Sequence, residues 1–560
     1  MEKYAVPYKL EVPISGVRLT EGRYQRAFEN NIRFLKGFDL DRMLYWYRVH
    51  KNKPAPGAPY AGDAGHFENN LKGQTAGEFL MGACTSLLWQ EDTELREISR
   101  ALIAEMEACR DEDGFIIPIP KEEFNTKEYA NYTRAWITFG LLDAGYAGEE
   151  RAFKLARDMS DYFNTSYVLP YVKDLNLGFQ GILANTRMYD APNGKWEDMQ
   201  VAKDHYEERW WLEQIIAGDH RAIYDHPGNH PHSTLLTTLE GYCDLYRATG
   251  EGIYLDAVKS ALSMYEDKWQ HVGGGINMCE FDTYWPGCNW LDPRRKYNEL
   301  CSTNFWVLLN QRMHRLEPDN AHYVDEMENS IYNMLFASQV GDQGYHYLNY
   351  LERTKDYRWL DRASCCASLG TRLAGLLPQF LYTYTDDTVY IDMYASSEAQ
   401  LPNGVKLCVV SSLPEAGDVN VRVIAAEKPF TLKMRVPRWA CDDGKSYYKV
   451  RHDVRAGDEF NLKFPFLYRV TKYTGGEEIV GKSRYAVEYG PMLFAAIGAP
   501  NPLTVRFDPQ KPDAWFTPAP YKFSGGTSLK LLLKGDHRHE YRPYMDIDDE
   551  PFSVYPIVEA

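Results

Sequence analysis

Apolar side chains in the first two-thirds of the chain recur at the spacing that is typical of helices. From Leu235 to Tyr246, and again from Leu255 to Tyr265, they return every three or four residues and so share one helix face. The sequence Ala-Thr-Gly-Glu-Gly separates the two segments, which together predict a helical hairpin. Similar patterns occur near residues 30–48, 74–90, 94–109, 133–146, 150–164, 206–217, 299–316, 322–337 and 366–384. About eleven helices are expected in this way, and paired helices in that number favour an (α/α)6 barrel as the catalytic domain over residues 25–385.

In the last third of the chain the period of the apolar positions changes to two. Apolar and polar residues alternate from Val389 to Tyr394 and from Thr431 to Val436, as they do along strands. Turn sequences occur at 402–404 and 442–444. We therefore expect residues 386–560 to form antiparallel, jelly-roll-like β-sandwich material.

A strand-like run from Val12 to Leu19 also lies near the start of the chain. We expect the N-terminal segment 1–24 to contribute this strand to the β region. The predicted fold class is therefore a multidomain α plus β protein, with a helical barrel followed by β-sandwich material. A chain of 560 residues is long enough for two or three domains.

The charge balance narrows the range of partners. The chain carries 62 Lys and Arg against 79 Asp and Glu, which gives a net charge of −17 at pH 7. An acidic surface repels phosphate backbones and anionic lipids, so we expect no nucleic-acid and no membrane partner. No apolar run reaches the roughly 18 residues of a membrane-spanning helix. The first residues also lack the pattern of a secretory leader, so a cytoplasmic location is expected unless a leader was removed.

Ten cysteines occur in the chain, and two of them are adjacent at the start of a predicted helix, Cys365 and Cys366. A long chain without a secretory signal favours reduced thiols in buried, metal-bound or catalytic roles. A helix N-terminus favours thiolate over thiol, although both residues could also be small buried hydrophobes. Glu299 and Cys301 open a second predicted helix. Three thiolates and a carboxylate are ligands that Zn²⁺ accepts, but neither cluster matches a zinc-finger spacing.

These sequences resemble a known family, the cysteine glycosidases of glycoside hydrolase family 127, typified by β-L-arabinofuranosidases. The resemblance covers most of the chain and is carried by Tyr-Asn-Glu-Leu-Cys (297–301), by Tyr-His-Tyr-Leu-Asn-Tyr-Leu-Glu (345–352) and by the Cys-Cys-Ala-Ser-Leu-Gly-Thr-Arg helix start. Weaker matches are Pro-Ile-Ser-Gly-Val-Arg-Leu-Thr-Glu-Gly near the start and Tyr-Gly-Pro-Met-Leu-Phe at 489–494. The resemblance implies a zinc-dependent glycosidase.

By position, the resemblance implies roles for particular residues. Glu299, Cys301, Cys365 and Cys366 would be the zinc ligands, and Cys365 would also be the nucleophile. Tyr347 would lie with its hydroxyl near that nucleophile, although core packing is an equally good interpretation of this tyrosine.

The general acid/base of the family is a glutamate that follows a Gly-Gly-Ile turn. Here Gly-Gly-Ile at 274–276 is followed by Glu280 and Asp282. We take Glu280 as the acid/base and Asp282 as the alternative, because the length of this loop departs from the family pattern. A solvated surface carboxylate is the remaining interpretation.

The sequence departs from the family where relatives carry pocket histidines. Gln74 and Ala135 stand at those positions, so contacts with the sugar hydroxyl groups cannot be the same. His230 and His232, in the His-Pro-Gly-Asn-His-Pro-His segment, could supply replacement contacts, cap the next helix or bind metal adventitiously. We take Gln74, Tyr347, His230 and His232 as candidate substrate-binding residues, and we expect weak activity on simple β-L-arabinofuranosides.

The function that the resemblance implies is an exo-acting, retaining glycoside hydrolase with a zinc-bound cysteine nucleophile. It would remove a terminal furanose-type sugar from a small glycoside or oligosaccharide, with Zn²⁺ as its cofactor. The sequence leaves open whether the chain forms a homodimer. The first alternative is another reaction on a helical barrel, such as sugar epimerisation or polysaccharide cleavage by a lyase. The second is a carbohydrate-binding protein without turnover, in which the zinc is structural.

Overall fold

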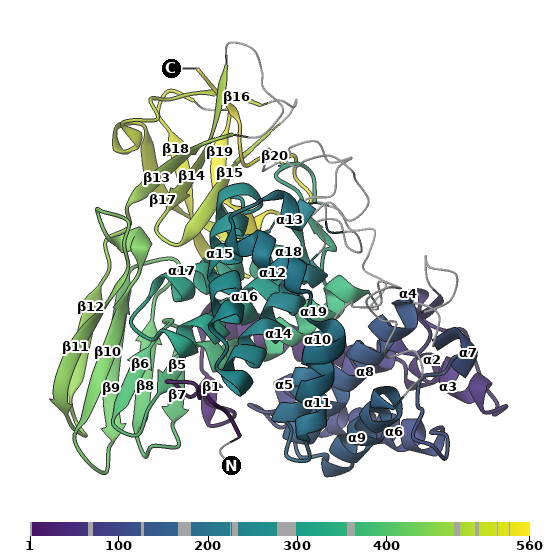
Figure 1. Cartoon of the computed structure of the whole chain (residues 1–560). Coiled ribbons are helices and arrows are strands. Elements are labelled where there is room, and N and C mark those ends of the chain that lie inside the picture. The colour runs from purple at the N-terminus through teal and green to yellow at the C-terminus, as the bar shows by residue number, and fades with distance from the viewer. Residues whose placement is uncertain are drawn as a thin grey trace.

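The structure is a computed structural model of the chain. It describes residues 3–64, 71–124, 128–165, 181–224, 226, 233–276, 298–355, 364–474, 482–498, 503–523, 525–536 and 538–559. Figure 1 shows a helical part, in purple to teal, beside two β-rich parts in green and yellow. The protein is thus a mixed multidomain protein with β-rich domains in its C-terminal third, as the change of period predicted.

Six helices of the first part pack against one another in cyclic order, so that the last contacts the first. They are α5 (Gln74–Leu87), α8 (Glu128–Tyr146), α10 (Gly181–Asp190), α14 (Thr234–Thr249), α16 (Leu300–Leu316) and α19 (Cys365–Gly375). We call these six the ring helices. Every residue of α5 is buried, and all but Cys365 in α19 are buried too. The ring therefore forms the centre of the helical part.

Further helices cover the ring, and most of the ring helices contact the long helix that follows them in the chain. The covering helices are α6 (Thr93–Ala108), α9 (Glu150–Asn164), α11 (Trp196–Val201), α15 (Gly252–Lys268) and α17 (His322–Ser330). Helix α1 (Gly22–Lys36) contacts both α5 and α19. Shorter helices are α2 (Leu40–Met43), α3 (Tyr45–His50), α4 (Ala61–Ala64), α7 (Lys121–Phe124), α12 (Arg209–Ile216), α13 (Arg221–Tyr224) and α18 (Phe336–Ser338). Unlike α5, α6 buries only one face, as expected of a helix at the surface.

Small residues let the ring helices approach closely. A Cβ placed on Gly77 of α5 would lie 2.5 Å from the backbone oxygen of Trp136 in α8. On α19, Thr371 lies against Gly82 of α5, and Thr85 of α5 lies against Gly375. The contact partner on α19 moves from residue 371 to residue 375 as the position on α5 moves from 82 to 85. The two helices are therefore parallel and begin at the same end of the ring.

Charged side chains of the ring helices form ion pairs between helices. Arg312 of α16 contacts Glu240 of α14 at 2.5 Å and Asp244 at 3.4 Å. Arg372 of α19 contacts Asp143 of α8 at 3.2 Å. Burial raises the pKa of Glu240 to about 7, and the Arg312 guanidinium opposes that shift. These pairs connect ring helices that are distant in sequence.

Two sheets form the green region of Figure 1. The five-stranded sheet has the order β1 (Val17–Leu19), β7 (Ser397–Gln400), β8 (Lys406–Ser411), β9 (Asp418–Ala425) and β12 (Glu459–Lys463). The four-stranded sheet has the order β11 (Tyr447–Val454), β10 (Phe430–Val436), β6 (Thr388–Ile391) and β5 (Tyr382–Tyr384). Neighbouring strands are antiparallel except β10 and β6, which are parallel. The turns expected at 402–404 and 442–444 are present.

The first strand of the chain belongs to this later region. In β1, Val17 pairs with Ala399 and Leu19 pairs with Ser397 of β7. Both apolar side chains of β1 are buried. An early segment of the chain thus forms the edge strand of a sheet whose other strands come after residue 396.

A third sheet, yellow in Figure 1, follows in the chain. It contains β13 (Tyr468–Lys472), β14 (Ser483–Tyr489), β15 (Met492–Ile497), β16 (Thr504–Arg506), β17 (Phe516–Phe523), β18 (Gly526–Leu533), β19 (Glu540–Pro543), β20 (Phe552–Ser553) and β21 (Ile557–Glu559). Strand β4 (Glu352–Arg353), from the helical part, pairs with β20. Asn333 accepts a hydrogen bond of 2.9 Å from the backbone nitrogen of Leu493, so this sheet also contacts the helical part.

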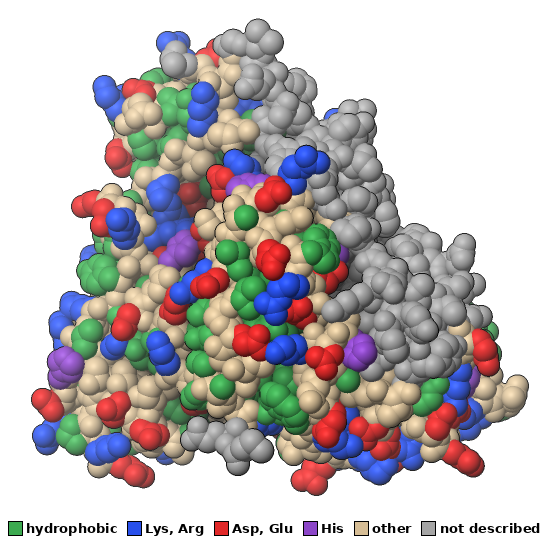
Figure 2. Space-filling view, viewed as in Figure 1, with side chains coloured by type: hydrophobic (Ala, Val, Ile, Leu, Met, Phe, Trp, Pro, Cys, Tyr) green, Lys and Arg blue, Asp and Glu red, His purple; other side chains and the backbone are tan. Residues whose placement is uncertain are grey.

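Acidic and basic side chains are interspersed over the face of the molecule in Figure 2. Opposite charges also pair between the parts of the chain. Arg435 of β10 contacts Asp325 and Glu328 of α17, each at 2.5 Å, and none of the three side chains is more than 3% exposed. Among the helices that the structure describes, none combines the length and apolar character needed to cross a bilayer.

Candidate metal and catalytic site

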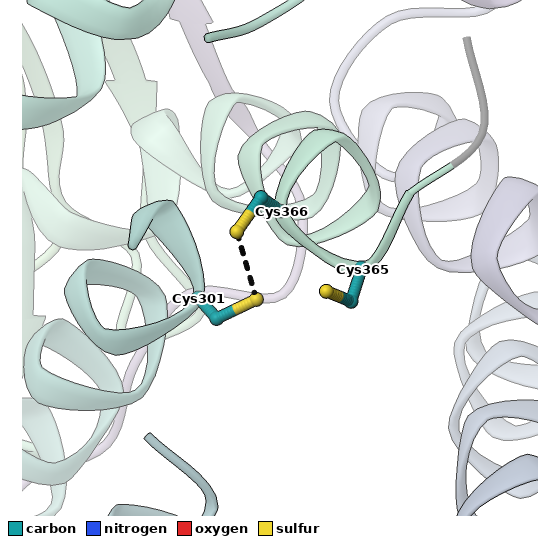
Figure 3. A group of neighbouring side chains, drawn as sticks. All are labelled: Cys301, Cys365 and Cys366. Carbon is teal, nitrogen blue, oxygen red and sulfur yellow. Dashed lines mark hydrogen bonds between the residues drawn. The ribbon is translucent and has the colours of Figure 1, made fainter. Parts of the chain in front are cut away.

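Three thiols from two ring helices converge at one end of the ring. Cys301 is the second residue of α16, and Cys365 and Cys366 are the first two residues of α19. The three sulfur atoms lie within 4.8 Å of one another, and the Sγ atoms of Cys301 and Cys366 are 3.1 Å apart. Figure 3 shows these two sulfurs pointing toward each other with Cys365 beside them. All three are free cysteines.

The sequence before α19 explains why the helix begins at this pair. Ser364 has an extended backbone, with φ −155° and ψ 155°, and its hydroxyl accepts a hydrogen bond of 3.1 Å from the backbone nitrogen of Ala367. A serine in this role fixes the first turn of a helix. The positive end of the helix dipole therefore lies at Cys365 and Cys366, where it favours negative charge.

The three thiols differ in their access to solvent and in their electrostatics. Cys301 and Cys366 are buried, whereas Cys365 is half-buried. Burial, together with hydrogen bonds that the Cys301 thiol donates to the other two sulfurs, raises the pKa of Cys301 well above its usual value. Burial also raises the pKa of Cys366, and the charges of Cys365 and Glu299 add to the shift. Three sulfurs at this spacing cannot all carry a negative charge unless a cation lies between them.

Glu299, the fourth expected ligand, lies next to the thiols but apart from their tight group. It ends β2 (Asn298–Glu299), directly before α16, and is 1% exposed. Its charge contributes to the raised pKa of Cys366. Among the described residues, however, the ligand atoms within 4.8 Å of one another are those of the three cysteines.

Tyr347 lies directly against the half-buried thiol. Its hydroxyl is 3.4 Å from the Sγ atom of Cys365. The next residues form β3 (Leu348–Asn349), which pairs with β2, and the backbone oxygen of Tyr347 accepts a hydrogen bond of 3.2 Å from Leu300. This small sheet connects Tyr347 to the start of α16 and so places its hydroxyl at the thiol group.

A buried histidine contacts β2, the strand that leads into α16. His271 accepts a hydrogen bond of 3.0 Å from the backbone nitrogen of Gly273, and its other ring nitrogen contacts the side-chain amide of Asn298. Burial lowers the pKa of His271 to about 3, so the ring is neutral at ordinary pH. Because Asn298 directly precedes Glu299, this contact holds the strand that leads to the expected ligand.

The two positions that depart from the family pattern both lie on ring helices. Gln74 is the first residue of α5 and is 3% exposed. Ala135 is fully buried within α8. Since α5 and α19 begin at the same end of the ring, Gln74 lies at the end that carries the thiols. Glu280, Asp282, His230 and His232 lie outside the described residues.

Two further buried carboxyl groups at this part of the ring were not anticipated, and one of them, Glu78, is near Cys365. Glu78, one helical turn after Gln74, is 1% exposed, and burial and the charges of Cys365 and Asp63 raise its pKa well above the usual value. Asp63 accepts hydrogen bonds from the backbone nitrogen and the hydroxyl of Thr75, at 3.0 and 2.7 Å, and burial raises its pKa to about 7. A signal was present: Glu78 is the lone acidic residue of the apolar segment 75–87.

Models of one family match two consecutive stretches of the chain. The model described as "Beta-L-arabinofuranosidase, GH127 catalytic domain" matches residues 16–378, which is more than half of the 560 residues. The model described as "Beta-L-arabinofuranosidase, GH127 middle domain" matches residues 388–466. All three thiols of the cluster and Tyr347 lie inside the first match.

Individual proteins of the same kind are also similar to the chain. A non-reducing end beta-L-arabinofuranosidase of Bifidobacterium longum subsp. longum is 23% identical over 244 residues, which cover 37% of this chain and 36% of that protein. The matched stretch is therefore about a third of the length of that relative.

Two solved structures resemble the whole chain. A GH127 beta-arabinofuranosidase has a TM-score of 0.76 at 17% identity, with 99% of this chain and 98% of the other covered. A GH127 beta-L-arabinofuranosidase from Geobacillus stearothermophilus T6 has a TM-score of 0.74 at 16% identity, with 97% and 100% covered. At these identities the likeness concerns the fold.

Proposed function

Because this chain belongs to the beta-L-arabinofuranosidase family GH127, we propose that it is a retaining glycoside hydrolase whose nucleophile is Cys365. It would release a terminal furanose-type sugar from a small glycoside or oligosaccharide. The observation that carries the proposal is the group of three free thiols at one end of the ring, of which Cys365 is the half-buried one. Tyr347, whose hydroxyl contacts that sulfur, supports the same role.

The donor set fits a zinc ion. Three sulfur atoms within 4.8 Å of one another, together with the carboxylate of Glu299 two residues before Cys301, offer the number and kind of donors that Zn²⁺ takes. Glu299, Cys301, Cys365 and Cys366 would hold it. When bound, the ion would favour the thiolate form of its cysteine ligands and fix their orientation.

The chain's own residues would carry out the two steps of hydrolysis. In the first, the Cys365 sulfur donates an electron pair to the anomeric carbon, and a C–S bond forms as the glycosidic C–O bond breaks. Glu280 gives its proton to the departing oxygen. In the second, Glu280 takes a proton from water, whose oxygen attacks the same carbon and releases the Cys365 sulfur. Two inversions retain the configuration of the sugar.

The sugar would be bound by side chains that enter this end of the ring. We assign hydroxyl contacts to Gln74, Tyr347, His230 and His232; in the sequence both histidines come just before α14, another ring helix. Since Gln74 and Ala135 replace two histidines, the preferred sugar or aglycone should differ from a simple β-L-arabinofuranoside. A hydroxyl-binding pocket discriminates strongly, because a wrong sugar leaves buried polar groups unpaired.

We propose that the ring helices are the inner layer of an (α/α)6 barrel over residues 25–385, with segment 1–24 and residues 386–560 forming the β region. The order of packing contacts and the pairing of β1 with β7 support this division. We also propose action in the cytoplasm on free carbohydrate, with no nucleic-acid or membrane partner.

The test is a panel of synthetic aryl glycosides, with product analysis by mass spectrometry and the anomer of the first product followed by NMR. We expect the wild type to release the aglycone and to retain the anomeric configuration of the sugar. Cys365→Ala should fold as the wild type does but lose turnover. Cys441→Ala, which changes a half-buried cysteine of the β region, is the matched control and should keep full activity. A cyclophellitol-type inhibitor should label Cys365.

Three outcomes would contradict the proposal. Labelling of a carboxylate in place of Cys365 would exclude the sulfur nucleophile. Conversion of a free sugar to its epimer, or an unsaturated product without added water, would assign the ring to an epimerase or a lyase. Sugar binding without turnover would leave a carbohydrate-binding protein.

A further inference from the structure

Glu78 is a buried carboxyl group that the proposed mechanism does not use. The side chain is 1% exposed, and within the described part of the chain neither of its oxygens has a hydrogen-bond partner. Buried carboxylates are almost always paired, because leaving one without a partner costs about 2 kcal/mol or more. A chain that keeps such a group on a ring helix tolerates a cost that packing alone does not explain.

The packing of α5 on α19 shows which residues Glu78 faces. Gly82 lies against Thr371 and the two helices are parallel, so one turn earlier Glu78 lies opposite Ser368. Cys365 is one turn earlier still on α19. The charge of Cys365 raises the pKa of Glu78 and contact with the Ser368 hydroxyl lowers it, which agrees with this placement.

Ser368 lies near the carboxyl group but gives its hydroxyl proton to another acceptor. Its hydroxyl donates its one proton to the backbone oxygen of Ser364, at 2.9 Å. The oxygens of Glu78 therefore keep their hydrogen-bonding capacity at the thiol end of the ring. Gln74, four residues earlier on α5, shares the same helix face.

A third ring helix brings a tyrosine to the same place. Tyr132 of α8 has its pKa raised by burial first, and then by the charges of Cys365, Cys301 and Glu78. Polar groups of α5 and α8 thus lie near enough to Cys365 for their charges to interact with it.

From these contacts we infer that Glu78 binds the sugar: its two carboxyl oxygens form hydrogen bonds with hydroxyl groups of the glycone that is held against Cys365. The inference rests on the proposed function and names a specificity residue for it. A carboxyl group with two such oxygens fits a pair of neighbouring hydroxyl groups: the carboxylate accepts a proton from each, and the protonated acid donates to one and accepts from the other. Sugars that lack this pair would leave the carboxyl group buried and unpaired, so they would be rejected.

The ring offers a matched control for Glu78. Glu240 is equally buried on a ring helix, but Arg312 contacts it at 2.5 Å. If Glu78 is kept for ligand binding and Glu240 for structure, removing the two carboxyl groups should have opposite effects on the stability of the ligand-free protein.

The first measurement is thermal unfolding of the full-length, zinc-replete protein. Glu78→Met should leave the Tm unchanged or raise it, because an unpaired polar group gives way to an apolar one of similar volume. Glu240→Met should lower the Tm, because Arg312 then loses the nearer of its two carboxylate partners and keeps only Asp244, at 3.4 Å. Zinc content should be unchanged in both. A fall in Tm for Glu78→Met as large as that for Glu240→Met would show a structural role and overturn the inference.

The second measurement uses the best glycoside of the panel and its deoxy analogues. Glu78→Gln and Glu78→Met should lower kcat/KM about 10-fold and about 100-fold or more for the parent glycoside. For the analogue that lacks the contacted hydroxyl group, wild type and variants should agree within about threefold. Glu240→Met should discriminate between parent and analogue as the wild type does. Equal losses on every analogue, or no loss at all, would overturn the assignment.

A binding measurement separates this inference from the proposed function. L-Arabinose, D-xylose and D-galactose are each titrated calorimetrically into wild type and Glu78→Met. If the wild type hydrolyses no glycoside but binds one of these sugars, and the variant does not, the proposed hydrolysis fails while the role of Glu78 stands. If the variant binds the sugar as tightly as the wild type, the role of Glu78 fails.

Discussion

Adjacent residues of a helix point in directions about 100° apart, and this difference gives Cys365 and Cys366 separate environments. Cys366 points toward Cys301 of the neighbouring ring helix and is fully buried, as Figure 3 shows. Cys365 is half-buried and contacts the hydroxyl of Tyr347. One thiol can therefore hold a metal without meeting substrate, while the other can do both.

Replacing the buried thiols should remove the metal. We expect elemental analysis to find one zinc per chain in the wild type and much less in Cys301→Ser and Cys366→Ser, since a hydroxyl is a poor substitute for a thiolate ligand. Both variants should also unfold at lower temperature. Cys441→Ser, outside the cluster, serves as control. Zinc content that stays at the wild-type level in both variants would show that the metal binds elsewhere or not at all.

Asp63 should make stability depend on pH in the direction opposite to that of most carboxylates. Burial raises its pKa from 3.8 to about 7, so between these values the folded chain keeps a proton that the unfolded chain has lost. Stability falls as the pH rises through this window, by an amount on the order of 4 kcal/mol. Asp63→Asn keeps the acceptor for Thr75 and cannot ionise.

Denaturant unfolding at pH 5 and pH 8 tests this expectation. The difference in unfolding free energy between Asp63→Asn and wild type should increase from pH 5 to pH 8, in favour of the variant. Parallel pH profiles for the two proteins would show that Asp63 does not titrate in this range.

At the scale of elements, the sequence pattern predicts well where a strand or a helix occurs. It does not predict which face of that element is covered by another part of the chain. The alternation from Thr431 to Val436 identifies β10 correctly, and Leu432 and Met434 are buried. Arg435 breaks the pattern, because it is fully buried between two carboxylates of α17. Only the packing of two distant elements could reveal that pairing.

The candidate site shows the same limit. The two thiol clusters were predictable from their positions at helix starts, and the structure brings them together. Glu78 was missed, because the apolar pattern of this helix shows only that a carboxylate interrupts it. The pattern does not show which residues of other helices lie opposite Glu78. Its neighbours on α19 lie nearly 300 residues later in the chain.

The close crossing of α5 and α8 should not tolerate a methyl group. In Gly77→Ala the added Cβ would lie 2.5 Å from the backbone oxygen of Trp136, so the helices must separate. We expect a loss of about 3 kcal/mol or more in the free energy of unfolding. Gly252→Ala, at the start of α15 with no atom within 4 Å of the new Cβ, should change stability by less than about 1 kcal/mol. Equal Tm values for the two variants would contradict the close approach.

At the scale of the whole molecule, buried ion pairs connect the helical part to the sheets. Arg435 contacts Asp325 and Glu328. Arg23 of α1 contacts Glu415, between β8 and β9, and Asp546, near the end of the chain. The parts should therefore unfold together, because separating them exposes charges whose partners lie in another part.

Two variants on β10 test the importance of this connection. Arg435→Met leaves two buried carboxylates without their partner and should cost about 3 to 5 kcal/mol. Lys433→Met removes a pair with Asp319, which is 82% exposed, and should cost less than about 1 kcal/mol. Denaturant unfolding with separate probes for helix and sheet should give one transition in the wild type. Two separated transitions in the wild type would show that the parts unfold independently.

The pairing of β1 with β7 also has a consequence for the order of events during synthesis. A ribosome makes residue 17 long before residue 397, so the first strand must remain without its neighbour while the helices between them are translated. The ring has the same property, because α5 cannot meet α19 until residue 375 has left the exit tunnel. Late, long-range closure of this kind is slow and exposes apolar surface. Expression should therefore depend on chaperone supply and growth temperature more than on the stability of the finished protein.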